Sequence, residues 1–181
     1  MRRLPRAVVV APILAAALVL APSAGAQTPA PAPPPPVSCA AQPQSHQFDF
    51  WVGEWDVTTL QGGHAGDSSV QKILGDCVVF ENWHGARGGD GKSLNAYNAP
   101  LGRWEQFWVS SSGTVTEYRE SRWVGTSLEL TAHVGASDAP TMLRMTFTPV
   151  DANTVRQFGE RSKDGGQTWA AAYDLYYHRK G

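Results

Sequence analysis

The residues of this sequence that could do chemistry are polar side chains that alternate with aromatic ones. Side chains at positions i and i+2 of a β-strand lie on the same face, so Glu81 shares a face with Trp83, and Gln106 with Trp108. Inside a small barrel, such a face forms a pocket for a small lipophilic molecule with a polar end. The residues expected to line this pocket are Glu81, Trp83, Trp104, Gln106, Trp108, Tyr118 and Arg156.

The same side chains have a second interpretation, in which they simply fill the interior. Glu81 and Arg156 would then form a buried ion pair. A buried Glu81 could instead act as a general acid or base, so an enzyme is a further hypothesis. We predict no catalytic residues, because the sequence contains neither a GxSxG elbow nor a Cys-His pairing cue.

Two glycine-rich segments resemble known binding loops but are expected to be structural. The stretch ARGGDGKS at 86–93 fits a loose phosphate-loop pattern, yet strand-like residues follow it where such a loop requires a helix. The stretch SKDGGQTW at 162–169 matches the Asp-box of β-hairpin turns. We expect Asp164 to bind amides of the turn and Trp169 to cover the base of the hairpin.

The elements that must position these residues are short stretches rich in Val, Thr, Tyr, Phe and Trp. They are separated by brief Gly, Asp, Asn or Pro breaks, which favours consecutive antiparallel strands. The ten predicted stretches are 51–60, 68–74, 77–84, 93–98, 103–110, 114–123, 127–134, 141–149, 154–161 and 168–177.

A barrel explains this arrangement best, because closing the sheet removes the two unpaired edges that so many strands would leave. We therefore predict an all-β, antiparallel up-and-down (meander) β-barrel of 8–10 strands over residues 39–181. A two-sheet sandwich is the alternative. A single helical turn is expected near Gln47–Trp51, and Trp51 and Trp55 are expected to close one end of the barrel.

The chain contains the segments FDFWVGEWDV at 48–57, LGDCVVFENW at 74–83, GKSLNAYN at 91–98, RWEQFWV at 103–109 and VRQFGERSKDGGQTW at 155–169. Together they resemble an uncharacterised bacterial family of exported, lipocalin-like (calycin-type) domains of unknown function with an FDFWxGxW signature. The resemblance implies a barrel and no established activity. In lipocalins an Arg from a late strand packs over the signature Trp. The candidates here are Arg156 first and Arg179 second, against Trp55.

Haem is the cofactor hypothesis that such barrels raise. Barrels similar to nitrobindin hold haem through one histidine on a late strand, and His178 occupies a comparable place, provided that it faces inward. The five histidines occur singly, without HxH or HExxH, so no metal site is expected. The leading hypothesis therefore includes no cofactor.

The N-terminus reads as a secretory signal peptide over residues 1–26, with early arginines, a short apolar stretch and a small-residue ending. A Pro-rich linker over 27–38 follows. Cys39 and Cys77 are the only cysteines, and an even count in an exported chain favours a disulfide, with two buried thiols as the alternative. We expect a periplasmic or secreted protein with no stable membrane span after cleavage.

Charge and composition narrow the range of partners. Charged residues make up 17% of the chain and the net charge is -1, so nucleic acid is not an expected partner. The leading hypothesis is a binder of a small lipophilic molecule. The alternatives are the haem-binding barrel, the Glu81-dependent enzyme, and a structural or interaction module with a filled core, whose protein partner the sequence does not name.

Overall fold

The computed structural model describes residues 38–135 and 141–181. They form eleven antiparallel up-and-down strands in one nearly closed barrel-shaped sheet, which confirms the predicted fold class. The strands are β1 (Gly53–Thr59), β2 (His64–Ile73), β3 (Val78–Gly85), β4 (Gly91–Asn98), β5 (Arg103–Ser110), β6 (Val115–Tyr118), β7 (Glu120–Val124), β8 (Ser127–Val134), β9 (Thr141–Asp151), β10 (Thr154–Ser162) and β11 (Ala170–Arg179). The short helices are η1 (Cys39–Ala41), η2 (Pro43–His46), η3 (Asp49–Trp51) and η4 (Ala99–Leu101).

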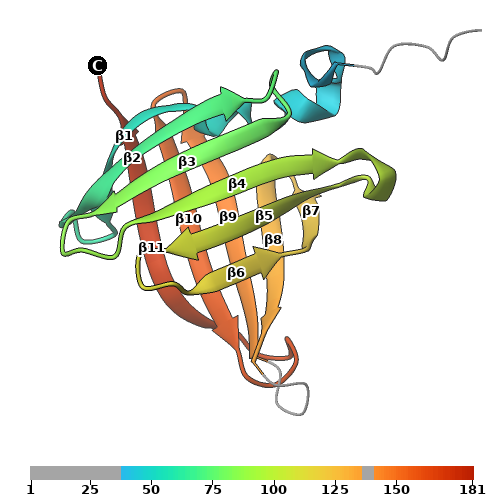
Figure 1. The fold of residues 1–181 in the computed structure, drawn as a ribbon. Coiled ribbons are helices and arrows are strands. Elements are labelled where there is room, and N and C mark those ends of the chain that lie inside the picture. Colours follow the sequence, from blue (N-terminus) through green and yellow to red (C-terminus); the bar gives the residue numbers. More distant parts are fainter. Residues whose placement is uncertain (1–37, 136–140) are drawn as a thin grey trace, which may run out of the picture. The chain divides into compact units, whose positions relative to one another are not determined.

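Each strand pairs with its neighbours in the chain, except that β6 and β7 do not pair with each other, and β1 also pairs with β11. The sheet therefore curls round so that β4, β5 and β6 cross in front of β8, β9 and β10 (Figure 1). The two edges of the sheet are β6 and β7. Across this seam the Trp104 backbone N–H donates to the Ser121 hydroxyl at 2.9 Å, which ties β5 to β7.

All ten predicted strand segments coincide with observed strands. The total is eleven rather than 8–10, because the segment 114–123 divides at Arg119 into β6 and β7. The division lies at the seam, where the chain passes from one edge of the sheet to the other. The expected helical turn before the first strand is η3.

One end of the barrel is closed by aromatic side chains. Phe48 and Trp51 from the η3 segment are fully buried, and their rings lie 4.9 Å and 4.5 Å from that of Phe147. Trp55 is also fully buried, and its indole N–H donates to the Trp51 carbonyl at 2.9 Å. The guanidinium of Arg179 lies 4.3 Å from the Trp55 ring centre. The second candidate for this packing, Arg179, thus occupies the place where Arg156 was expected.

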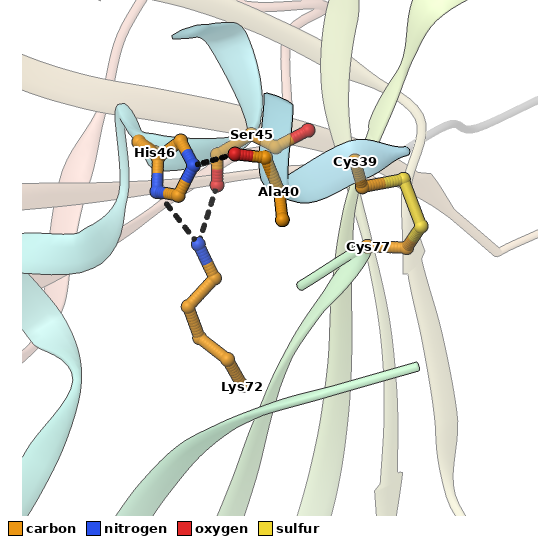
Figure 2. Close-up of a disulfide and its surroundings, with 6 residues drawn as sticks. All are labelled: Cys39, Ala40, Ser45, His46, Lys72 and Cys77. Atoms are coloured by element: carbon orange, nitrogen blue, oxygen red, sulfur yellow. Dashed lines mark hydrogen bonds between the residues drawn. A yellow bond between two sulfur atoms is a disulfide. The ribbon is translucent and has the colours of Figure 1, made fainter. Parts of the chain in front are cut away.

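The segment before β1 is fastened to β2 and to the β2–β3 turn. The predicted disulfide between Cys39 and Cys77 is present. Beside it, the Lys72 ammonium donates to the Ser45 carbonyl at 3.1 Å and approaches His46, whose ring also contacts the Ala40 carbonyl (Figure 2). The covalent link and these polar contacts hold the η1 and η2 turns at the barrel wall.

The turn between β10 and β11 has the contacts expected of an Asp-box hairpin. The Asp164 carboxylate accepts bonds from the Thr168 amide and hydroxyl and from the Ser162 hydroxyl. Trp169 donates to the Gly166 carbonyl, and the Arg144 guanidinium lies 4.1 Å from its ring centre. These contacts join the turn to the outer face of β9. The predicted signal peptide (1–26) and the linker (27–38), except Ser38, lie outside the described residues.

Candidate functional site

The barrel contains a cavity of about 370 Å³ between the closed end and the opposite rim. This volume is at the lower end of the range, roughly 300–1,000 Å³, of pockets that hold small molecules. Five of the seven predicted ligand-binding residues line it. The lining residues are Glu81, Trp83, Gln106, Trp108, Thr116, Tyr118, Met145, Gln157, Tyr173, Leu175 and Tyr177.

Glu81 forms the polar floor of this cavity. Its side chain projects inward from β3, where alternate residues face the interior, and the residue is 3% exposed. Oε1 accepts hydrogen bonds from the Ser68 hydroxyl at 3.0 Å and the Tyr177 hydroxyl at 3.2 Å. Oε2 accepts one from the Ser93 hydroxyl at 3.1 Å. Three donors thus fix the carboxylate, two from the adjacent strands β2 and β4 and one from β11.

A second set of hydrogen bonds leads toward Glu81 from β5. The Gln106 amide donates to Asn95 Oδ1 at 2.7 Å, and the Asn95 amide donates to the Ser93 hydroxyl at 3.0 Å. Ser93 in turn donates to Glu81. Every bond in this series has its donor on the side away from Glu81, so the carboxylate is the final acceptor of the network.

Burial dominates the electrostatics of the floor. Loss of hydration raises the pKa of Glu81 to about 7, against the opposing effect of the hydrogen bonds from Ser68, Ser93 and Tyr177. Burial and the neighbouring Glu81 charge also raise the pKa of Tyr177 well above its usual 10. Neutral and ionised Glu81 are therefore both accessible near physiological pH, whereas Tyr177 stays neutral.

Aromatic rings at the cavity rim lie over glycines of the adjacent strands. A Cβ on Gly159 would come within 2.2 Å of the Tyr173 ring, and one on Gly91 within 2.3 Å of the Trp108 ring. Both glycines face inward beside these aromatic residues, as the strand registers show. The missing side chains leave room for the rings, so these glycines determine where the walls of the cavity lie.

Two predicted residues lie outside the cavity. Trp104 is buried at the closed end, where its ring packs edge-on against Phe48 at 5.6 Å and its indole N–H donates to Gln47 at 3.2 Å. Arg156 lies on the outer face of β10 in a two-bond ion pair with Asp174, at 2.7 and 2.9 Å. The buried Glu81–Arg156 pair of the filled-barrel interpretation is therefore absent, because the two side chains occupy opposite faces of the sheet.

Sequence reasoning missed the contribution of β11, which supplies three lining residues. Tyr173, Leu175 and Tyr177 alternate along this strand, so the period of two that indicated Glu81 and Trp83 was also present here. Gln157 on β10 was missed as well. Its side-chain oxygen lies 3.0 Å from the Tyr177 hydroxyl, whose single proton Gln157 and Glu81 share, and this contact joins β10 to the floor.

The histidines take no part in the cavity. His178 is exposed on the outer face of β11 and contacts the Thr58 hydroxyl at 3.1 Å. The inward orientation that haem coordination by this residue would need is therefore not present. Within residues 38–135 and 141–181, no group of three or more His, Cys, Asp or Glu side chains is arranged to hold a metal ion.

Comparison with models of known protein families gives no match, and comparison with curated proteins gives none either. In the described part of the chain, no helix combines the length and apolar character needed to cross a membrane. The functional argument accordingly depends on the geometry of the cavity.

Proposed function

We propose that this chain is an exported, non-enzymatic barrel that holds one small, largely apolar molecule in its interior. The observation that carries the proposal is the cavity itself, in which aromatic and aliphatic walls meet a buried and firmly hydrogen-bonded carboxylate. A few fixed polar groups in an apolar pocket orient a ligand and provide specificity. In a barrel with a purely structural role, side chains would be expected to fill this volume.

The remaining features fit this proposal. A disulfide persists in oxidising compartments, so the Cys39–Cys77 bond supports export to the periplasm or beyond. The packing of Arg179 over Trp55 supports the resemblance to lipocalin-like domains, in which a late-strand Arg covers the signature Trp. Residues 39–181 would then be the single ligand-binding domain, and residues 1–26 the export signal.

The proposal is tested with a neutral fluorescent probe and two neighbouring substitutions on β6. Thr116 lines the cavity, whereas Val115, on the other face of the strand, is 47% exposed and does not line it. We expect N-phenyl-1-naphthylamine to bind the wild-type protein and Val115→Trp at one saturable site. In Thr116→Trp the new indole would occupy the cavity, and the affinity should fall about tenfold or more.

Two results would count against the proposal. The first is an absence of saturable binding to the wild-type protein. The second is equal binding by Thr116→Trp and wild type when circular dichroism shows both to be folded, since the probe would then be outside the cavity.

A further inference from the structure

The charge of the cavity lining restricts the ligand. Among the described residues that line the cavity, Glu81 is the only acidic one, and none is Lys, Arg or His. Arg156 is on the outer face, bound to Asp174. Ionised Glu81 therefore has no positive partner in the cavity. An uncompensated buried charge is strongly unfavourable, so a positively charged ligand would gain the attraction that the protein does not supply, and an anion would be repelled.

The polar floor offers hydrogen-bond acceptors to such a ligand. Glu81 Oε2 accepts one hydrogen bond, from Ser93, and a carboxylate oxygen has capacity for a second. Gln106 donates through its amide nitrogen to Asn95, which leaves its carbonyl oxygen as an acceptor. An ammonium group carries only donors and satisfies both.

The walls of the cavity also suit a cation. Five of the lining residues are aromatic, and the faces of such rings attract ammonium groups most strongly where water is excluded. Tyr177 links the floor to the walls, because its hydroxyl binds Glu81 while its ring lies 6.4 Å from that of Trp83. The aromatic lining residues are Trp83, Trp108, Tyr118, Tyr173 and Tyr177.

From these three features we infer that the ligand is an organic cation, an amine or ammonium compound with an apolar ring, whose charged group contacts Glu81 between the aromatic walls. The inference rests on the proposed function, since it assigns the ligand class of the same cavity. It narrows a general lipophilic ligand to one charge type and disfavours fatty acids and other carboxylates.

Three indole compounds with different side-chain charges test the inference by calorimetry at about pH 8. Tryptamine is a cation, tryptophol is neutral and indole-3-acetate is an anion, while the ring is the same. We expect tryptamine to bind about tenfold more tightly than tryptophol or better, and indole-3-acetate to bind at least about tenfold more weakly than tryptophol.

The Glu81→Gln variant removes the charge while keeping the size of the side chain. Its affinity for tryptamine should fall about tenfold or more, while its affinity for tryptophol stays within about twofold. The matched control is Glu54→Gln, because Glu54 is exposed and its carboxylate also accepts a hydrogen bond from a serine, Ser69. This control changes the net charge equally and should bind all three compounds as wild type does.

A pH series on the wild-type protein gives a test that needs no variant. Tryptamine stays charged near neutral pH, because alkylamines have pKa values near 10. The other titratable groups of the described cavity lining are Tyr118 of β6 and Tyr173 and Tyr177 of β11. Burial raises the pKa of Tyr118 to about 12 and the pKa of the other two well above 10. The side chains contributed by β2, β4, β5 and β10, namely Ser68, Ser93, Gln106 and Gln157, do not titrate.

Glu81 is the titratable group of the described cavity lining whose pKa, about 7, lies in this range. The affinity for tryptamine should therefore rise about tenfold from about pH 6 to about pH 8. The affinity for tryptophol should not change. The same pH series on Glu81→Gln should be flat for both compounds.

The outcomes separate this inference from the proposed function. If N-phenyl-1-naphthylamine binds in the cavity but tryptamine shows neither preference over tryptophol nor dependence on Glu81, the ligand is not a cation and the binding function stands. If the fluorescent probe and all three indoles fail to bind, both are overturned.

Discussion

Replacing Glu81 by Gln should stabilise the barrel at alkaline pH and lose that advantage as the pH falls. In the folded protein burial raises the pKa of Glu81 from 4.5 to about 7. One pH unit is worth about 1.4 kcal/mol, so keeping Glu81 ionised inside the fold costs about 3 kcal/mol. The folded protein retains this proton to a higher pH than the unfolded chain does. Wild-type stability therefore decreases as the pH rises from about 4.5 to about 7.

The assay is urea unfolding of wild type and Glu81→Gln with the disulfide intact, repeated between about pH 5 and about pH 8.5. The difference between the two free energies of unfolding cancels every group that titrates alike in both proteins. It should change by about 2 to 3 kcal/mol in favour of the variant over this range. Lost hydrogen bonds from Ser68, Ser93 and Tyr177 shift the whole difference by a constant and leave its slope unchanged.

A difference that stays constant within about 0.5 kcal/mol across the pH range would refute the reasoning. Glu81 would then ionise equally in the folded and unfolded states.

Three further changes test other parts of the structure. Reducing the Cys39–Cys77 disulfide opens a loop with a sequence separation of 38 and should lower the free energy of unfolding by about 4 kcal/mol in urea titrations with and without reductant. Gly159→Ala places a Cβ 2.2 Å from the Tyr173 ring. It should lower the free energy of unfolding by about 1 to 3 kcal/mol and weaken binding of the fluorescent probe. The control Gly63→Ala, whose Cβ has its nearest contact at 3.4 Å, should have neither effect. Hydrogen bonds from Thr168 and Ser162 lower the pKa of Asp164 to about 2. The ionised carboxylate therefore stabilises the fold at pH values above 3.8, the ordinary pKa of Asp, and this stabilisation is lost as the pH falls toward 2. Asp164→Asn should accordingly lower Tm at neutral pH, and the difference from wild type should shrink in acid; an equal difference at both pH values would contradict the assigned role.

Much of the fold could be predicted because the relevant signals are local. Turn residues and alternation gave the strands, and the cost of unpaired edges indicated closure. The break at Arg119 could not be predicted, since it depends on where the sheet meets itself rather than on any turn residue in the segment 114–123. Closure at the seam is a property of the whole barrel.

The cavity was predictable only in part, for a related reason. Alternation shows which residues share a face of a strand, and it correctly grouped Glu81 with Trp83 and Gln106 with Trp108. It does not show which face points inward or how far along the axis a residue lies. Trp104 shares its face with Gln106 but lies at the closed end, and Arg156 was assigned to the interior although its strand presents it to the outside.

The most direct test of a ligand-binding cavity uses the two methionines of β9 as internal reporters. Met145 lines the cavity, whereas Met142 lies away from it, in a groove beside Trp169. In protein with ¹³C-labelled methionine methyl groups, titration with tryptamine should shift the Met145 signal and give intermolecular nuclear Overhauser effects to it, while the Met142 signal stays in place. Equal shifts at both methyl groups, or a shift at Met142 alone, would contradict binding inside the barrel.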